Sequence, residues 1–184
     1  VIPIASQMIT KDIRIILSTS LEAAEEMKIQ FGSVAPNDGS DIKIPVPSVS
    51  DKPDTETTKT ILSQIITARV NEILDAIQRE IKDSGYSNNI RAGLVFTGGG
   101  SKLEGLDSFA ESFFQKPSRI GSPKHIKGLE DLRGKTRYAT AVGLLLHRYK
   151  ELTSNKNSTK NTSKFGSMLD KYAKKISDYF QKEL

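Results

Sequence analysis

The sequence contains no cysteine and no tryptophan, and it has only two histidines, His125 and His147. Without cysteine the chain cannot form a disulfide, a thiolate metal site or a cysteine nucleophile, and this fits a reducing compartment. Two histidines are too few for a multi-histidine metal cage, and we expect both to be ordinary surface or boundary residues. No apolar run approaches the roughly 18 residues that a membrane-spanning helix needs.

The start of the chain also lacks the features of a signal peptide. Residues 1–4 include no initiator methionine, and neither a basic segment nor a long apolar segment follows. Residues 1–5 instead resemble the end of a strand that has been cut partway, so we expect a fragment or a processed form. A length of 184 residues predicts one globular domain with a little to spare.

Positive charge is concentrated at the end of the chain. The net charge is +5, from 27 basic and 22 acidic side chains, and residues 151–184 alone carry seven lysines against four acids. The rest is therefore nearly neutral, and a nucleic-acid-binding surface is poorly supported. A nucleic-acid-binding arm would also have basic residues without an apolar stripe, whereas this tail has such a stripe. We expect no nucleic-acid partner.

Hydrophobic periodicity predicts an α/β layered domain over residues 1–150. Apolar residues three and four apart predict helices, and short apolar or alternating runs predict strands. Polar, Ser/Pro/Asp-rich residues 47–54 predict a loop. The predicted helices cover residues 7–17, 21–31, 58–84, 103–115 and 136–149, and the predicted strands cover residues 1–5, 41–46, 92–97 and 118–121.

The last 34 residues predict a tether and an anchor. Residues 151–164 contain one apolar residue in fourteen, so they predict a flexible linker. Residues 165–184 predict an amphipathic helix with a lysine-rich flank, which suits an anionic membrane surface. A helix that docks back on the domain or on a partner is the alternative. The apolar face of this helix consists of Phe165, Met168, Leu169, Tyr172, Ile176, Tyr179 and Phe180.

A glycine-rich turn follows the predicted strand at 92–97 and precedes a predicted helix. In open α/β sheets, ligands bind at the carboxyl ends of strands, and glycines let a ligand approach the backbone. The turn matches neither a P-loop nor a dinucleotide fingerprint, and a tight turn without a ligand has the same spacing. Its residues are Thr97, Gly98, Gly99, Gly100 and Ser101.

Several stretches together closely resemble the C-terminal half of the FtsA family of bacterial cell-division proteins. The resemblance runs in order over nearly all of residues 1–150 and is specific as a set. Single pieces of it are shared across actin-like ATPases, including MreB and the heat-shock chaperones. The stretches that carry it are residues 9–13, 24–32, 94–101, 119–123 and 138–145.

The resemblance implies an actin-like (ribonuclease H-like) lobe with an inserted α/β subdomain at about residues 18–85. It also implies that ATP binds at the turn 97–101, and that Glu25 and Lys28 border the ribose and the adenine. An exposed helical ion pair is the alternative for Glu25 and Lys28, because they lie one helical turn apart. The family's phosphate loops and its Mg²⁺-positioning carboxylate lie upstream of Val1. We therefore expect Mg²⁺ to be held through a missing N-terminal half, and no catalysis by this chain alone.

The resemblance further implies a membrane adaptor for cell division. In the family, the inserted subdomain receives the C-terminal tail of FtsZ, and Arg69 and Glu72 match the family's Arg-x-x-Glu in the helix that lines that site. A solvated charged face accounts for either residue taken singly. The implied protein self-associates into actin-like polymers and lies on the cytoplasmic side of the membrane at the division site. An ATP-dependent enzyme or chaperone of the same superfamily is the alternative function.

Overall fold

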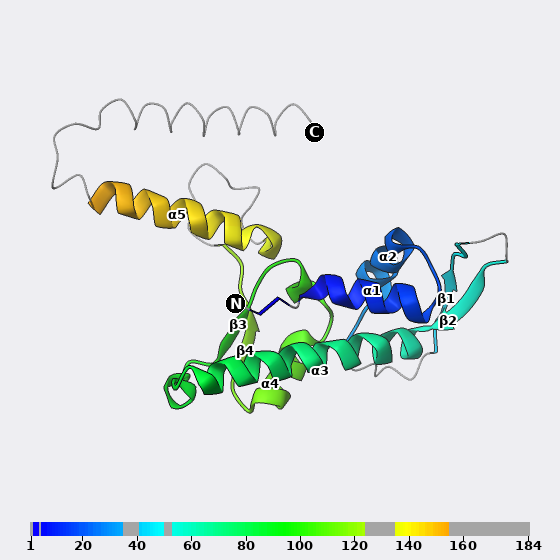
Figure 1. Ribbon diagram of the computed structural model, residues 1–184, viewed down its shortest axis with the longest axis horizontal. Helices are drawn as coiled ribbons and strands as arrows, with labels where there is room; N and C mark the ends of the chain where they lie inside the picture. Colours follow the sequence, from blue (N-terminus) through cyan, green and yellow to red (C-terminus); the bar gives the residue numbers. More distant parts are fainter. Residues whose placement is uncertain (1, 4, 35–40, 50–52, 124–134, 155–184) are drawn as a thin grey trace, which may run out of the picture. The chain divides into compact units, whose positions relative to one another are not determined.

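The computed structural model describes residues 2–3, 5–34, 41–49, 53–123 and 135–154 (Figure 1). The chain divides into two compact units, Val1–Gly121 and Ser122–Leu184. The first unit contains four α-helices and four strands among its described residues. In chain order these are α1 (Ser6–Ile16), α2 (Leu21–Phe31), β1 (Lys43–Val46), β2 (Thr55–Thr58), α3 (Lys59–Asp83), β3 (Leu94–Phe96), α4 (Leu106–Phe114) and β4 (Ser118–Ile120).

Three helices, α1, α2 and α3, enclose the main core. Their apolar residues recur every three or four positions, so each helix presents one apolar face to its neighbours. Two polar side chains cap the helices as their type predicts: Ser20 accepts from the amide of Ala23 at 3.0 Å, and Thr58 accepts from the amide of Ile61 at 3.3 Å. The fully buried side chains at the centre include Ile13, Ala24, Ile44, Leu62 and Ile66.

Strands β1 and β2 form an antiparallel pair beside the start of α3 (Figure 1). Pro45 lies opposite Glu56 in this pair, and a proline is tolerated there because the strand is at an edge. The hydroxyl of Thr19 donates to the carbonyl of Pro47 at 2.7 Å and so links the turn between α1 and α2 to the end of β1. Strand β2 is not predicted by the sequence pattern, because residues 55–58 have polar side chains and no apolar alternation.

Strands β3 and β4 pair in parallel, and α4 connects them. Gly93 precedes β3 with φ at +83°, and a Cβ there would lie 2.0 Å from the carbonyl oxygen of Pro117. Only glycine allows this close approach, and it lets the amide of Leu94 donate to the same carbonyl at 2.9 Å. The carboxyl end of β3 leads directly into the glycine turn.

Most predicted elements are confirmed, with shifts at their ends. The helix predicted at 21–31 has these bounds, and the one predicted at 58–84 is α3, with Thr58 and Ser84 as its caps. The helix predicted at 103–115 begins only at Leu106, because residues Gly100–Lys102 form a 3-10 turn. The strand predicted at 1–5 is wrong for residues 2, 3 and 5, which lie beside no partner strand among the described residues.

The second unit is described by α5 (Ala139–Ser154), which follows a 3-10 turn at Thr136–Tyr138. The helix continues to Ser154, four residues into the range predicted as a linker. Within this extension, Glu151 pairs with Arg148 at 3.0 Å one helical turn earlier. The rest of the predicted linker and the predicted amphipathic helix lie outside the described residues.

Candidate nucleotide and partner sites

The turn after β3 is held by its own hydroxyl groups. Thr97 donates to the carbonyl of Gly121 at 2.8 Å, which ties the turn to the end of β4. Ser101 is buried and donates to the carbonyl of Gly98 at 2.8 Å, which closes the turn on itself. The backbone at this edge is therefore fixed on both sides.

The three glycines of the turn differ in whether the backbone or the packing requires a glycine. Gly98 has φ at +92°, which side chains other than glycine rarely adopt. A Cβ on Gly100 would lie 2.8 Å from the Cβ of Ser6, so packing excludes a side chain there. Gly99 has φ at −64°, and no atom of the described residues lies within 4 Å of its would-be Cβ. Neither the backbone nor the packing of the described residues requires glycine at position 99.

Glu25 and Lys28, which the resemblance singled out, form a cluster with Thr10. The Lys28 ammonium donates to Glu25 Oε2 at 2.6 Å and to Thr10 Oγ1 at 2.8 Å, and Thr10 donates to the same carboxylate oxygen at 2.5 Å. The Lys28 side chain is only 11% exposed, so an exposed ion pair does not describe this arrangement. Sequence reasoning assigned no role to Thr10, because a buried threonine on an apolar helix face gives no separate signal.

The pKa of Glu25 is lowered by this cluster. Burial by itself would raise the pKa, but the hydrogen bonds from Lys28 and Thr10 and the positive charge of Lys28 outweigh burial. The carboxylate is therefore the form that the fold stabilises. The other oxygen, Oε1, has no hydrogen-bond partner among the described residues, and the side chain is 44% exposed.

Helix α1 brings the turn and the cluster together. Ser6 at its start contacts Gly100, and Thr10 lies one turn further on, about 6 Å along the axis at a rise of 1.5 Å per residue. Figure 1 shows the segment after β3 reaching the beginning of α1. No side chain caps this end of α1, where Ala5 is extended. The glycine turn, the Glu25 carboxylate and an uncapped helix end thus lie along one side of α1.

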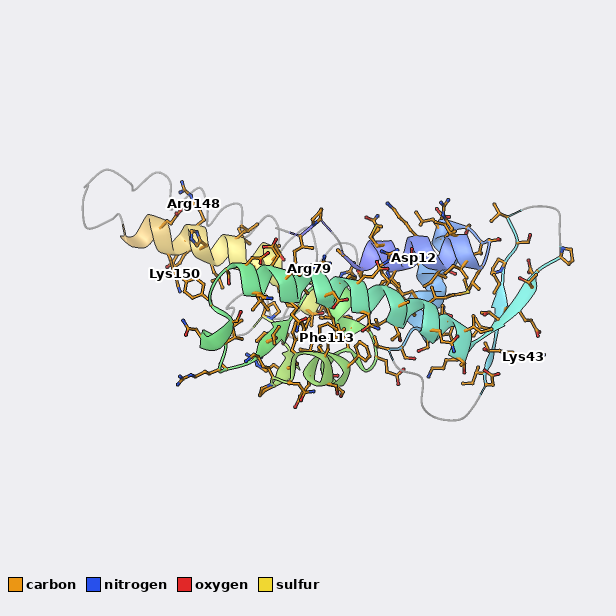
Figure 2. All side chains as sticks on the ribbon, turned by 60° about the horizontal axis from the view of Figure 1, so that its bottom comes forward. Asp12, Lys43, Arg79, Phe113, Arg148 and Lys150 are labelled. Carbon is orange, nitrogen blue, oxygen red and sulfur yellow. The ribbon has the colours of Figure 1, made fainter. Side chains whose placement is uncertain are left out.

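Arg69 and Glu72, the candidate partner-binding residues, are in direct contact on α3. Arg69 Nη1 donates to Glu72 Oε2 at 2.5 Å. Arg69 also makes two hydrogen bonds to Asp12 of α1, from Nε to Oδ2 at 2.5 Å and from Nη2 to Oδ1 at 2.8 Å. Hydrogen bonding to Asp12 is the main cause that raises the pKa of Arg69. In Figure 2, Asp12 lies where α1 meets α3.

The two residues of this site differ in exposure, which bears on the alternative of a solvated charged face. Arg69 is not simply a member of a solvated charged face, because its side chain is 22% exposed and that of Asp12 is 19% exposed. Glu72 is 61% exposed and does belong to the open surface. Sequence reasoning missed Asp12 because it lies 57 positions before Arg69, and no periodic pattern connects residues so far apart.

Within the part of the chain that the structure describes, no three histidine or acidic side chains are grouped so as to hold a metal ion. No described helix is both long enough and apolar enough to cross a membrane. The candidate membrane face, from Phe165 to Phe180, falls outside the described residues.

Comparison with known proteins identifies the family. The family model for cell division protein FtsA matches residues 1–143. The chain is 38% identical to the FtsA of Pseudomonas aeruginosa over 91% of this chain and 40% of that protein. It is 32% identical to the FtsA of Escherichia coli K12 over 100% of this chain and 45% of that protein. The chain thus spans less than half the length of the curated relatives it matches.

Solved structures identify the fold. MreB5 of Spiroplasma citri bound to ADP superposes with a TM-score of 0.67 over 86% of this chain and 48% of that chain, at 15% identity. The same protein bound to AMPPNP gives a TM-score of 0.66. At this identity the likeness shows an actin-like α/β fold and not a shared activity. The chain has this fold, and on the family match it belongs to the FtsA family of cell-division proteins.

Proposed function

We propose that this chain contributes one side of an ATP-binding cleft to an actin-like adaptor that tethers FtsZ filaments to the cytoplasmic face of the membrane at the division site. The observation that carries the nucleotide part is Gly99. A side chain there would have an allowed φ and would meet no atom of the described residues within 4 Å, so the glycine is best explained by a ligand that approaches the backbone. The ADP bound to the MreB5 neighbour supports the same reading.

The other residues of the site suit a nucleoside. The turn 97–101 offers backbone to a flat ring, and Lys28 has one N–H donor left after bonding Glu25 and Thr10. Glu25 Oε1 is placed to accept from a hydroxyl group, as acidic residues do for ribose in other nucleotide-binding folds. On the family resemblance, the magnesium site and the phosphate loops are assigned to the region that precedes this chain in the family's sequences. The turn 97–101, Lys28 and Glu25 are therefore assigned to the nucleoside.

Gly99→Ala in the full chain tests the nucleotide site. The residue has a helical φ, so alanine leaves the fold intact, while the new methyl group occupies the space of the ligand. We expect ATP affinity, measured by isothermal titration calorimetry, to fall by about tenfold, which corresponds to about 1.4 kcal/mol. Gly143→Ala on α5 is the matched control, since its Cβ also meets no atom of the described residues within 4 Å. Unchanged ATP affinity in Gly99→Ala would mean that 97–101 is only a strand-to-helix turn.

The partner part of the proposal places the C-terminal tail of FtsZ on α3 at Glu72 and the outer edge of Arg69. Asp12 and Glu72 already take three of the five guanidinium N–H groups of Arg69. Glu72 is exposed and can exchange partners at low cost, since exposed ion pairs contribute about 0.2–1 kcal/mol. A tail with both acidic and basic groups fits this mixed surface.

Glu72→Gln tests the partner site more cleanly than a change at Arg69, which also holds α1 against α3. Glu80→Gln is the matched control, because it is an exposed glutamate further along the same helix. We expect fluorescence anisotropy with a labelled FtsZ tail peptide to show weaker binding for Glu72→Gln and no change for Glu80→Gln. Equal binding by both variants would move the partner site away from Glu72.

The tether part of the proposal rests on the sequence pattern of residues 165–184. Their aromatic and apolar face and their lysines suit insertion parallel to an anionic membrane surface, where each lysine adds on the order of 1 kcal/mol. Self-association into actin-like polymers is part of the same proposal and is supported by the actin-like fold.

A further inference from the structure

A buried hydroxyl group organises the Glu25 and Lys28 cluster. Thr10 is 2% exposed, and its hydroxyl contacts both the carboxylate and the ammonium. An ammonium can only donate, so the hydroxyl accepts from Lys28 and its single proton goes to Glu25 Oε2. The direction of both hydrogen bonds is therefore fixed by chemistry.

This arrangement anchors one oxygen of Glu25 and leaves the other available. Oε2 accepts from Thr10 at 2.5 Å and from Lys28 at 2.6 Å, whereas Oε1 has no partner among the described residues. Without Thr10, the one described hydrogen bond to Glu25 would come from Lys28, three residues further along the same helix. A carboxylate held by a single side chain is freer to change rotamer than one held from two helices.

We propose that Thr10 is a positioning residue, which holds Glu25 so that Oε1 faces the sugar hydroxyls of a bound nucleoside. The inference rests on the proposed nucleotide site. Thr10 itself is buried behind the carboxylate and does not contact the ligand. A change at Thr10 should therefore alter the affinity only for ligands whose sugar hydroxyls donate to Glu25.

A pair of ligands separates positioning from general support of the fold. ATP and 2′,3′-dideoxy-ATP differ only in the hydroxyls that Glu25 would accept from. In the full chain, we expect Thr10→Val to weaken ATP binding about fivefold to tenfold, the equivalent of one typical hydrogen bond, and to leave the dideoxy analogue within about twofold. Thr10→Ser keeps the hydroxyl and should restore the preference for ATP. Equal losses for both ligands would overturn the inference.

Thr19→Val is the matched control. Thr19 is also a buried threonine whose hydroxyl makes one hydrogen bond, but its acceptor is the carbonyl of Pro47, away from the cluster. We expect the ratio of the two affinities in Thr19→Val to equal that of the unchanged chain. The same drop in the ratio in both variants would contradict a specific role for Thr10.

Two further measurements keep the inference testable if Thr10→Val binds neither ligand. The hydrogen bond from Thr10 lowers the pKa of Glu25, so its NMR titration without ligand should move to higher pH in Thr10→Val and return in Thr10→Ser. If the titration does not move in Thr10→Val, the inference is overturned.

Glu25→Ala separates the two proposals: if it binds ATP normally, the nucleotide site itself is wrong. If it weakens ATP while Thr10→Val leaves the ligand ratio unchanged, only the role of Thr10 is wrong.

Discussion

The contact between Asp12 and Arg69 gives the most quantitative prediction, because it joins α1 to α3 through a pair that is only about one-fifth exposed. The perturbation is a double-mutant cycle with Asp12→Ala, Arg69→Met and the combined variant. Methionine keeps most of the apolar stem of Arg69, so the cycle isolates the two hydrogen bonds and the charge attraction.

The expected coupling energy follows from the exposure of the pair. Exposed ion pairs contribute about 0.2–1 kcal/mol, whereas removal of one partner from a fully buried pair costs about 3–5 kcal/mol. Two well-formed hydrogen bonds to Asp12, at 2.5 and 2.8 Å, and residual contact with water place this pair between the two limits. We expect a coupling energy of about 1.5 kcal/mol, near the lower end for hydrogen bonds to charged groups.

Amide hydrogen exchange of the full chain is the suitable assay, because it reports local opening in α1 and α3. A loss of about 1.5 kcal/mol lowers the protection of these amides by roughly tenfold. The matched control is the pair of Lys43 and Glu56, whose atoms are 2.9 Å apart but whose side chains are 74% and 62% exposed. If the cycle at Asp12 and Arg69 gives no larger coupling than the control cycle, the argument from burial is refuted.

Further predictions concern pH, packing and the membrane. The pKa of Glu25 is below its ordinary value of 4.5, so the pairing of Glu25 stabilises the fold fully above pH 4.5, and this stabilisation is lost as the pH falls through the lowered pKa. The difference in free energy of urea unfolding between the chain and its Glu25→Gln variant should therefore shrink over that acidic range. Ser63→Ala should cost about 1–3 kcal/mol in the same assay, since it leaves the buried carbonyl and hydroxyl of Ser33 without their partner. Replacement of Tyr172 and Phe180 by Glu should abolish co-sedimentation of the full chain with anionic vesicles; persistent binding would contradict the anchor.

The fold could be predicted largely from local pattern. Periodicity gave α2 with its observed bounds and gave α3 with caps at Thr58 and Ser84, because a long apolar stripe and polar capping residues are local properties. It failed at β2, where residues 55–58 all have polar side chains and pair with β1 through their backbone. Backbone pairing of polar residues leaves no hydrophobic alternation in the sequence.

The candidate site divides in the same way. The sequence by itself determined most of the elements and the glycine turn, and the family resemblance singled out Glu25, Lys28, Arg69 and Glu72 as candidate site residues. Only the tertiary structure decided which of these groups have partners from other helices: Thr10 for the first pair and Asp12 for the second. The physical reason is that helix packing brings together residues that lie 15 positions apart (Thr10 and Glu25) or 57 positions apart (Asp12 and Arg69). A periodic sequence pattern relates only residues a few positions apart and does not predict such contacts.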